Sequence, residues 1–212
     1  VGARPGQTVL DAGAGVGAVS LCLAWRCPEL VIRGMELQPE LATLAQENIA
    51  ANGMAARVSI QQGDIRQPPP EIGQATFDHT VCNPPFHVAG RSSAPPNASK
   101  AIAHGEGETP LQEWLAFCLR RTVSGGTVTV IHRGDRLAAL LSGLRQGAGD
   151  MVVFPLWARL DKPAKRIIVQ ARVGGRGPDI MHPGLCLLDA DGNDSAQARA
   201  VLRDGAALDM SS

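Results

Sequence analysis

The sequence predicts an α/β fold built on a mostly parallel sheet. Short apolar runs alternate with segments of helical periodicity, and polar or glycine-rich residues follow four of these runs. Such alternation places helices on both faces of a parallel sheet. The chain has 212 residues, of which 44% are hydrophobic and 19% charged, as expected for a globular protein rather than a disordered one.

The first half of the chain supplies four strands and two helices. We expect strands at Thr8–Leu10, Leu30–Met35, Arg57–Gln61 and Ala75–Cys82, and helices at Val16–Trp25 and Pro39–Ala51. The second helix has a proline in its first turn and Gly53 just past its end. Leu41, Leu44, Ala45 and Ile49 share one face of it.

The second half continues the alternation. We expect helices at Leu111–Val123 and Arg136–Leu144 and strands at Gly126–Ile131, Met151–Leu156 and Arg166–Ala171. The last two strands have a short connection, which predicts an antiparallel pair at one edge of the sheet. Residues 87–109 show no periodicity, and loops of that length are usually functional or disordered.

Composition excludes several classes of protein. No run approaches 18 apolar residues, which predicts no transmembrane helix and no membrane partner, and the start has no signal-peptide core. A strand begins almost at once without an initiator Met, so we expect a truncated N-terminus. The 20 basic and 20 acidic residues cancel, which excludes a basic field over the whole molecule. Five irregularly spaced cysteines predict reduced thiols in a cytoplasmic protein, and neither they nor the scattered histidines predict a metal site.

A glycine-rich turn follows the first strand at Asp11-Ala12-Gly13-Ala14-Gly15-Val16-Gly17. Glycines there allow a tight turn and a close approach of the backbone to a ligand, and ligands of open α/β sheets bind at such strand ends. Gly13, Gly15 and Ala18 also satisfy a relaxed dinucleotide-binding pattern. The turn alone therefore does not distinguish which cofactor binds.

Two carboxylates follow the next two strands. Glu36 ends the second strand, where a carboxylate can accept both hydroxyls of a ribose. Asp64 follows the third strand, where it can accept from an adenine amino group while Ile65 covers the ring. Alone, Glu36 is better explained as a solvated acid at a strand end, but its spacing of 19 residues from the glycine turn favours a ligand. Asp64 alone is equally consistent with a turn residue at a strand end.

The segment Asn83-Pro84-Pro85-Phe86 follows the fourth strand. Two prolines stiffen the turn and leave their carbonyls free to accept hydrogen bonds. The Asn83 side-chain oxygen and the Pro84 carbonyl can then accept both hydrogens of one planar amino group, and Phe86 supplies a face for stacking. A nicotinamide enzyme has no use for this motif.

These motifs resemble those of class I S-adenosylmethionine-dependent methyltransferases, in the branch that methylates amino groups. The resemblance implies a seven-stranded Rossmann-like sheet with a reversed strand and S-adenosyl-L-methionine as cofactor. It implies a catalytic group formed by Asn83, Pro84, Pro85 and Phe86. It also implies a cofactor site formed by Asp11, Gly13, Gly15, Gly17, Glu36, Leu37, Asp64, Ile65 and Asn83. We expect residues 1–173 to form the catalytic domain and residues 174–212 to form an extension packed on it.

A narrower resemblance covers nearly the whole chain. Val130-Ile131-His132-Arg133, Lys162-Pro163-Ala164-Lys165-Arg166 and the ending Ala200–Leu208 are similar to the bacterial tRNA(Val) adenine-N6 methyltransferases. That family usually has Tyr at the position of Phe86, and a helix that precedes its first strand is missing here. The resemblance implies methylation of adenine N6 in tRNA. The alternative methylation targets are guanine N2 in ribosomal RNA and the side-chain amide of a protein glutamine. The oligomeric state, monomer or homodimer, is left undecided.

The neutral total charge conceals an uneven distribution. Residues 159–176 hold six basic residues against Asp161 alone, whereas residues 177–212 hold six Asp against two Arg. The basic segment suits contacts with RNA phosphates, although a charged edge that prevents aggregation is the plainer interpretation. The residues expected to bind RNA are Arg91, Lys100, Lys162, Lys165 and Arg166.

Overall fold

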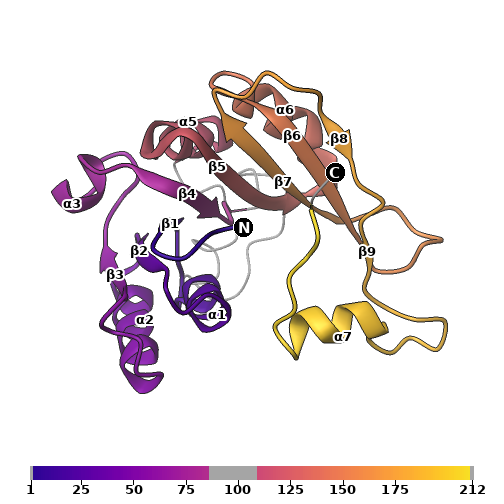
Figure 1. Cartoon of the computed structure of the whole chain (residues 1–212), viewed down its shortest axis with the longest axis horizontal. Coiled ribbons are helices and arrows are strands. Elements are labelled where there is room, and N and C mark those ends of the chain that lie inside the picture. Colours follow the sequence, from indigo (N-terminus) through magenta and orange to yellow (C-terminus); the bar gives the residue numbers. More distant parts are fainter. Residues whose placement is uncertain (1, 86–108, 211–212) are drawn as a thin grey trace, which may run out of the picture.

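A computed structural model describes residues 2–85 and 109–210 and shows a mixed α/β fold (Figure 1). Its main strands are β1 (Thr8–Ala12), β2 (Val31–Glu36), β3 (Val58–Gln62), β4 (Phe77–Cys82), β5 (Thr122–Arg133), β6 (Ala148–Trp157) and β7 (Arg166–Val173). Its helices are α1 (Ala18–Arg26), α2 (Pro39–Ala51), α3 (Pro70–Gly73), α5 (Leu111–Arg121), α6 (Leu137–Leu144) and α7 (Ala196–Leu202), with a 3₁₀ turn, η1, at Gly134–Arg136. The predicted alternation is confirmed, with ends that differ by a few residues.

The strands form one sheet in the order β3-β2-β1-β4-β5-β7-β6. Strands β1 to β5 pair in parallel, and β7 runs antiparallel to both β5 and β6. The antiparallel pairing predicted for the last two long strands is confirmed, and the reversed strand lies between β5 and β6. Two strands of two residues each, β8 (Ile180–Met181) and β9 (Leu185–Cys186), extend the sheet beside β6 and were not expected.

Helices cover both faces of the sheet, as Figure 1 shows. On one face α1 and α2 bury Leu23, Ala24, Ala45 and Ile49 against β1, β2 and β3. On the other face α5 and α6 bury Leu115, Phe117, Leu140 and Leu144 in a larger cluster with β4 to β7. Strands β1, β2 and β4 therefore contribute to both clusters, whereas β3 at the edge buries Val58 and Ile60 on one face and leaves Ser59 exposed. Burial on both sides explains why the central strands are rich in apolar residues.

The register of the sheet determines where the functional site can form. Ala12 of β1 lies opposite Met35 of β2 and Cys82 of β4, and Glu36 lies opposite Gln62 of β3. The four parallel strands thus end at one edge. The residues that follow them, the glycine turn, Glu36, Asp64 and Asn83, are brought together although 72 positions separate Asp11 from Asn83.

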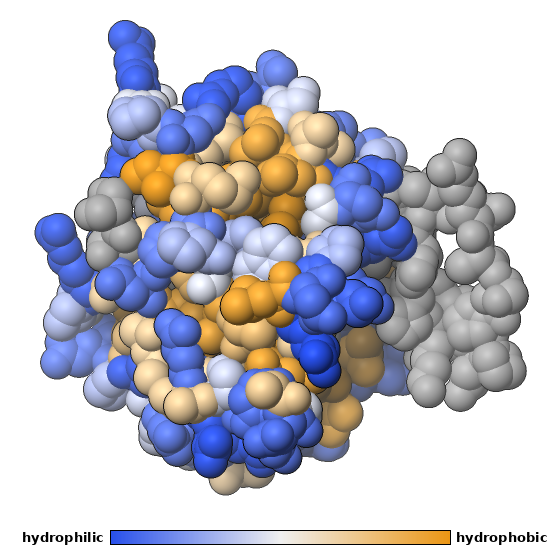
Figure 2. Space-filling model, turned by 90° about the vertical axis from the view of Figure 1, so that its right-hand side faces the viewer, coloured by the Kyte–Doolittle hydropathy of each residue, from blue (hydrophilic) through white to orange (hydrophobic). Residues whose placement is uncertain are grey.

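The C-terminal residues pack against β6 and α1. β8 and β9 pair with β6, and Gly205 lies against the ring of Trp25 in α1, where an added Cβ would come within 2.2 Å of the indole. Figure 2 views this side and shows two hydrophobic areas separated by a polar band. Among the described residues, no helix is long and apolar enough to cross a membrane.

Candidate functional site

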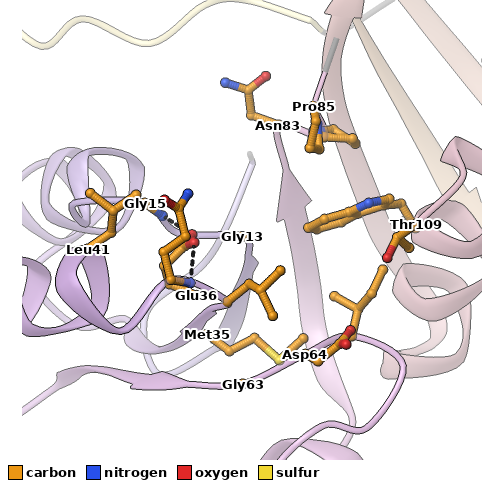
Figure 3. A pocket seen from close by; sticks show the side chains of 15 residues that line it. Gly13, Gly15, Met35, Glu36, Leu41, Gly63, Asp64, Asn83, Pro85 and Thr109 are labelled. Atoms are coloured by element: carbon orange, nitrogen blue, oxygen red, sulfur yellow. Dashed lines mark hydrogen bonds between the residues drawn. The ribbon is translucent and has the colours of Figure 1, made fainter. Parts of the chain in front are cut away.

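A cavity of about 310 Å³ opens at the carboxyl ends of the parallel strands (Figure 3). Predicted site residues that line it are Gly13, Gly15, Glu36, Leu37, Asp64, Ile65, Asn83, Pro84 and Pro85. Lining residues that the sequence did not reveal are Met35, Gln38, Leu41, Gly63, Thr109 and Trp114. The volume is within the range of small-molecule sites, and the lining combines apolar side chains with a few polar groups.

Glu36 holds the backbone of the cavity in place. Its Oε2 accepts a hydrogen bond of 2.9 Å from the N–H of Gly15, and its Oε1 accepts one of 3.0 Å from the N–H of Gln38. The side chain is nearly buried. A carboxylate oxygen has more than one lone pair, so each oxygen can still accept from a hydroxyl group of a ligand.

The glycine turn adopts conformations that favour glycine. Gly13 and Gly15 have φ angles of 74° and 55°, and the N–H groups of Gly13 and Ala14 both donate to the Met35 carbonyl at 2.9 Å. No described atom lies within 4 Å of a Cβ built on Gly15, so that position is open. Gly17 does not line the cavity. It precedes α1 with a φ angle of 85° and packs against Ile60 and Ala45.

Asp11 lies behind the glycine turn and is not among the residues that line the cavity. Its carboxylate is 3% exposed and accepts a hydrogen bond of 2.7 Å from the Ser20 hydroxyl of α1. Burial raises its pKa to about 6, while the Ser20 hydrogen bonds oppose the rise and the charge of Glu36 adds to it. Its predicted contact with a cofactor stays a prediction.

Asp64 lies at the far end of the cavity from Asn83, as Figure 3 shows. Arg66 holds its carboxylate through side-chain hydrogen bonds of 3.0–3.4 Å and a backbone N–H bond of 2.9 Å. Partial burial opposes ionisation, but the Arg66 hydrogen bonds and charge outweigh it and lower the Asp64 pKa. An ionised carboxylate next to the buried side chain of Ile65 therefore forms this end.

The other end of the cavity is formed by Asn83, Pro84 and Pro85, which directly follow β4. The Asn83 side chain is exposed, as an amide that receives a ligand requires, whereas Pro84 is buried. Phe86 lies outside the described residues.

His132 lies beside this motif on the next strand. It is near the end of β5 and 1% exposed, and the Pro85 backbone opposes the lowering of its pKa. Burial lowers its pKa to about 4, with the Arg136 charge contributing, so the ring is neutral at pH 7. The default expectation that this histidine has a core role fits its burial.

Cys82, one residue before Asn83, is a buried thiol of the strand. Its hydrogen bond with Cys118 and its burial raise its pKa well above the usual range. The thiolate that a nucleophilic cysteine requires is therefore not formed at neutral pH. This supports the interpretation of Cys82 as a structural residue.

Residues 159–166, the first half of the basic segment, lie at the same edge of the sheet, whereas Arg172 lies toward the opposite end. Residues 158–165 connect β6 to β7, and Arg166 at the start of β7 lies opposite Arg133 at the end of β5. The Gly134 N–H donates to the Lys165 carbonyl at 3.1 Å. Lys162, Lys165 and Arg166 are exposed and lie two strands from Asn83 along this edge. Arg91 and Lys100 lie outside the described residues.

The order of the strands, the reversed β7 and the cavity at their carboxyl ends define the class I methyltransferase fold. The crystal structure of a predicted O-methyltransferase, protein Atu636 from Agrobacterium tumefaciens, has this fold. The superposition covers 98% of this chain and 94% of that protein, with a TM-score of 0.79 and 20% sequence identity. The hMettl16 catalytic domain in complex with MAT2A 3'UTR hairpin 1 covers 84% of this chain and 68% of its own, with a TM-score of 0.58 and 16% identity.

Sequence comparison narrows the class. Residues 2–105 match the model of the methyltransferase small domain family. The tRNA1(Val) (adenine(37)-N6)-methyltransferase of Porphyromonas gingivalis is 34% identical over 136 residues, which are 63% of this chain and 52% of that protein. The protein of the same name from Citrobacter koseri is 40% identical over 94 residues, 44% of this chain and 38% of that protein. The chain spans about half the length of the curated relatives it matches, or less.

Proposed function

We propose that this chain is an S-adenosylmethionine-dependent methyltransferase that modifies an exocyclic amino nitrogen of a nucleobase, adenine N6 in tRNA. One observation carries the proposal: Asn83, Pro84 and Pro85 share one cavity with Gly13, Gly15, Glu36 and Asp64. An amine-binding motif and a nucleoside-binding edge thus open into a common space. The names of the curated relatives support adenine N6 in tRNA as the target.

The described residues fit an adenosyl cofactor. The Glu36 oxygens are fixed by two backbone N–H groups and can accept the ribose hydroxyls, while Asp64 can accept from the adenine amino group beside Ile65. Gly15 leaves open space where a side chain would intrude. When bound, S-adenosylmethionine supplies an electrophilic methyl group, which passes to the amine nitrogen while the sulfonium becomes a neutral thioether.

Asn83 and Pro84 hold the amine that receives the methyl group. The Asn83 amide oxygen and the Pro84 carbonyl accept the two amine hydrogens, which favours a pyramidal nitrogen and a more available lone pair. This arrangement needs no strong base, because the amine proton becomes acidic as the new bond forms. Most of the acceleration then comes from positioning. The base must be unpaired or flipped to enter, which an anticodon loop permits.

Lys162, Lys165 and Arg166 supply the contacts to RNA phosphates in this proposal. They lie on the carboxyl edge of the sheet, so RNA bound there can place a base near Asn83. Contacts of this kind give affinity that falls as salt rises. Arg91 and Lys100 remain predictions for the same role.

The test is a methylation assay with tritiated S-adenosylmethionine and bulk tRNA from a strain that lacks the related activity. Nucleoside mass spectrometry of the product identifies the modified base. We expect N6-methyladenosine in tRNA. Label that appears instead as N2-methylguanosine in ribosomal RNA, or in a protein glutamine, would reject the tRNA adenine assignment and keep the methyltransferase.

A further inference from the structure

The indole of Trp114 forms part of the cavity wall between the two ends. Trp114 belongs to the first two turns of α5 and lines the cavity with its partly exposed side chain. Its Nε1 is buried and has no hydrogen-bond partner among the described residues. Because the nitrogen is hidden, the side-chain surface that the cavity can reach belongs to carbon atoms. The ring therefore presents aromatic rather than polar surface.

The ring is fixed against the glycine turn. A Cβ built on Gly13 would lie 2.8 Å from Cη2 and 3.1 Å from Cζ3 of Trp114, closer than side chains pack. The rest of the side chain packs against the core cluster beneath α5 and α6. The absence of a side chain at Gly13 thus allows the indole to come directly against the backbone of the turn.

The order of the strands gives the position of this contact within the cavity. Along the sheet edge Asp64 follows β3, Glu36 ends β2, Gly13 follows β1 and Asn83 follows β4. Trp114 touches Gly13, so it lies between the nucleoside-binding residues and the amine-binding residue. In the proposed function the methyl donor atom must lie in this interval, because the methyl group has to reach an amine held at Asn83.

The donor atom of S-adenosylmethionine is a sulfonium, which carries a positive charge. The carboxylates that line the described part of the cavity belong to Glu36 and Asp64, which are held by backbone N–H groups and by Arg66. Asp11 faces Ser20 behind the turn. An aromatic face attracts a cation without a negative charge, more strongly for Trp than for Phe.

We propose that the Trp114 ring stabilises the sulfonium through a cation–π contact and so makes the site discriminate the charged cofactor from its neutral product. This inference rests on the proposed function. It gives the cavity a physical means to bind S-adenosylmethionine and release S-adenosylhomocysteine, which differ at this point in one methyl group and one charge.

Calorimetric titration of three ligands tests the proposal without turnover. The ligands are S-adenosylmethionine, S-adenosylhomocysteine and sinefungin, in which a carbon bearing a protonated amine replaces the sulfur bearing the methyl group. In Trp114→Leu and Trp114→Met we expect both cations to bind about tenfold more weakly, while S-adenosylhomocysteine changes by no more than about twofold. Trp114→Phe keeps a ring and should recover part of the preference.

Trp25→Leu is the matched control, because Trp25 is 63% exposed on α1 and lies outside this cavity. It should leave all three affinities unchanged. Circular dichroism identifies any variant that fails to fold, and the folded Trp114 variants then decide the result. Equal losses for charged and neutral ligands would overturn the cation–π proposal while leaving the proposed function intact. A folded wild-type protein that binds none of the three would overturn both.

Discussion

The carboxylate of Glu36 joins two parts of the cavity wall, because one of its oxygens accepts from the Gly15 N–H and the other from the Gln38 N–H. The glycine turn after β1 and the start of the loop after β2 are thereby held at a fixed separation. Both carboxylate oxygens of Glu36 are thus held in place by the backbone of the cavity wall.

Replacing Glu36 by Gln should weaken both this link and ligand binding. One oxygen becomes an NH₂ group, which cannot accept from a backbone N–H, so one nearly buried donor loses its partner. We expect a loss of about 1–3 kcal/mol in the free energy of unfolding and about tenfold weaker cofactor binding. Chemical denaturation and calorimetry measure the two effects. Glu47→Gln, on the exposed face of α2, should change neither; equal effects of the two substitutions would contradict this role.

Asn83→Ala separates cofactor binding from methyl transfer. The side-chain oxygen that accepts from the target amine is removed, whereas Glu36, Asp64 and the glycine turn remain. We expect methyl transfer to tRNA to fall by at least about 10³-fold and cofactor affinity to change by less than about threefold. Single-turnover assays and equilibrium dialysis provide the two values. Undiminished turnover in this variant would refute the proposed way of holding the amine.

Titration of the Asp11 carboxyl group should lower the free energy of unfolding as pH rises. Its pKa is about 6 in the folded protein against 3.8 for the free side chain, so the folded state binds the proton more tightly. A raised pKa gives stability that is fully present below about pH 4 and lost as pH rises through about 6. The shift corresponds to about 3 kcal/mol.

Asp11→Asn removes this titration and keeps an oxygen that can accept from Ser20. We expect the variant to gain stability relative to wild type as pH rises from 4 to 7, measured by chemical denaturation at several pH values. Asp64, Asp78 and Asp135 have lowered pKa values, so their contributions to the free energy of unfolding are lost as pH falls. Both proteins contain these residues, so their contributions cancel in the difference between variant and wild type. A difference that does not vary with pH would show that Asp11 does not titrate in this range.

The fold was largely predictable because the central parallel strands β1, β2 and β4 contribute to the clusters on both faces of the sheet and are therefore rich in apolar residues. β8 and β9 escaped prediction, since two residues cannot show a periodicity and their pairing with β6 depends on tertiary contacts. The helix expected to reach Val123 ends at Arg121, where β5 begins.

The site was predictable where a residue directly follows a strand, because parallel strands end at a common edge. Trp114 was missed since it reaches the cavity from α5, and no spacing in the sequence links it to Gly13. Asp11 belongs to the glycine motif, but it lies within β1 and its side chain faces α1. Motif membership alone could not reveal that orientation.

The basic segment should affect RNA binding without affecting the cofactor. Lys162→Gln with Lys165→Gln removes two exposed charges at the edge shared with Asn83, and neither side chain lines the cavity. We expect the slope of log affinity for tRNA against log salt to fall by about 1–2, with the cofactor dissociation constant unchanged. The slope is measured by fluorescence anisotropy with labelled tRNA at about 50 to 200 mM salt. Arg203→Gln, an exposed residue after α7 that pairs with Asp194, is the control and should have a smaller effect. If the lysine pair and the control shift the slope equally, the alternative interpretation of the basic segment as a charged sheet edge is the correct one.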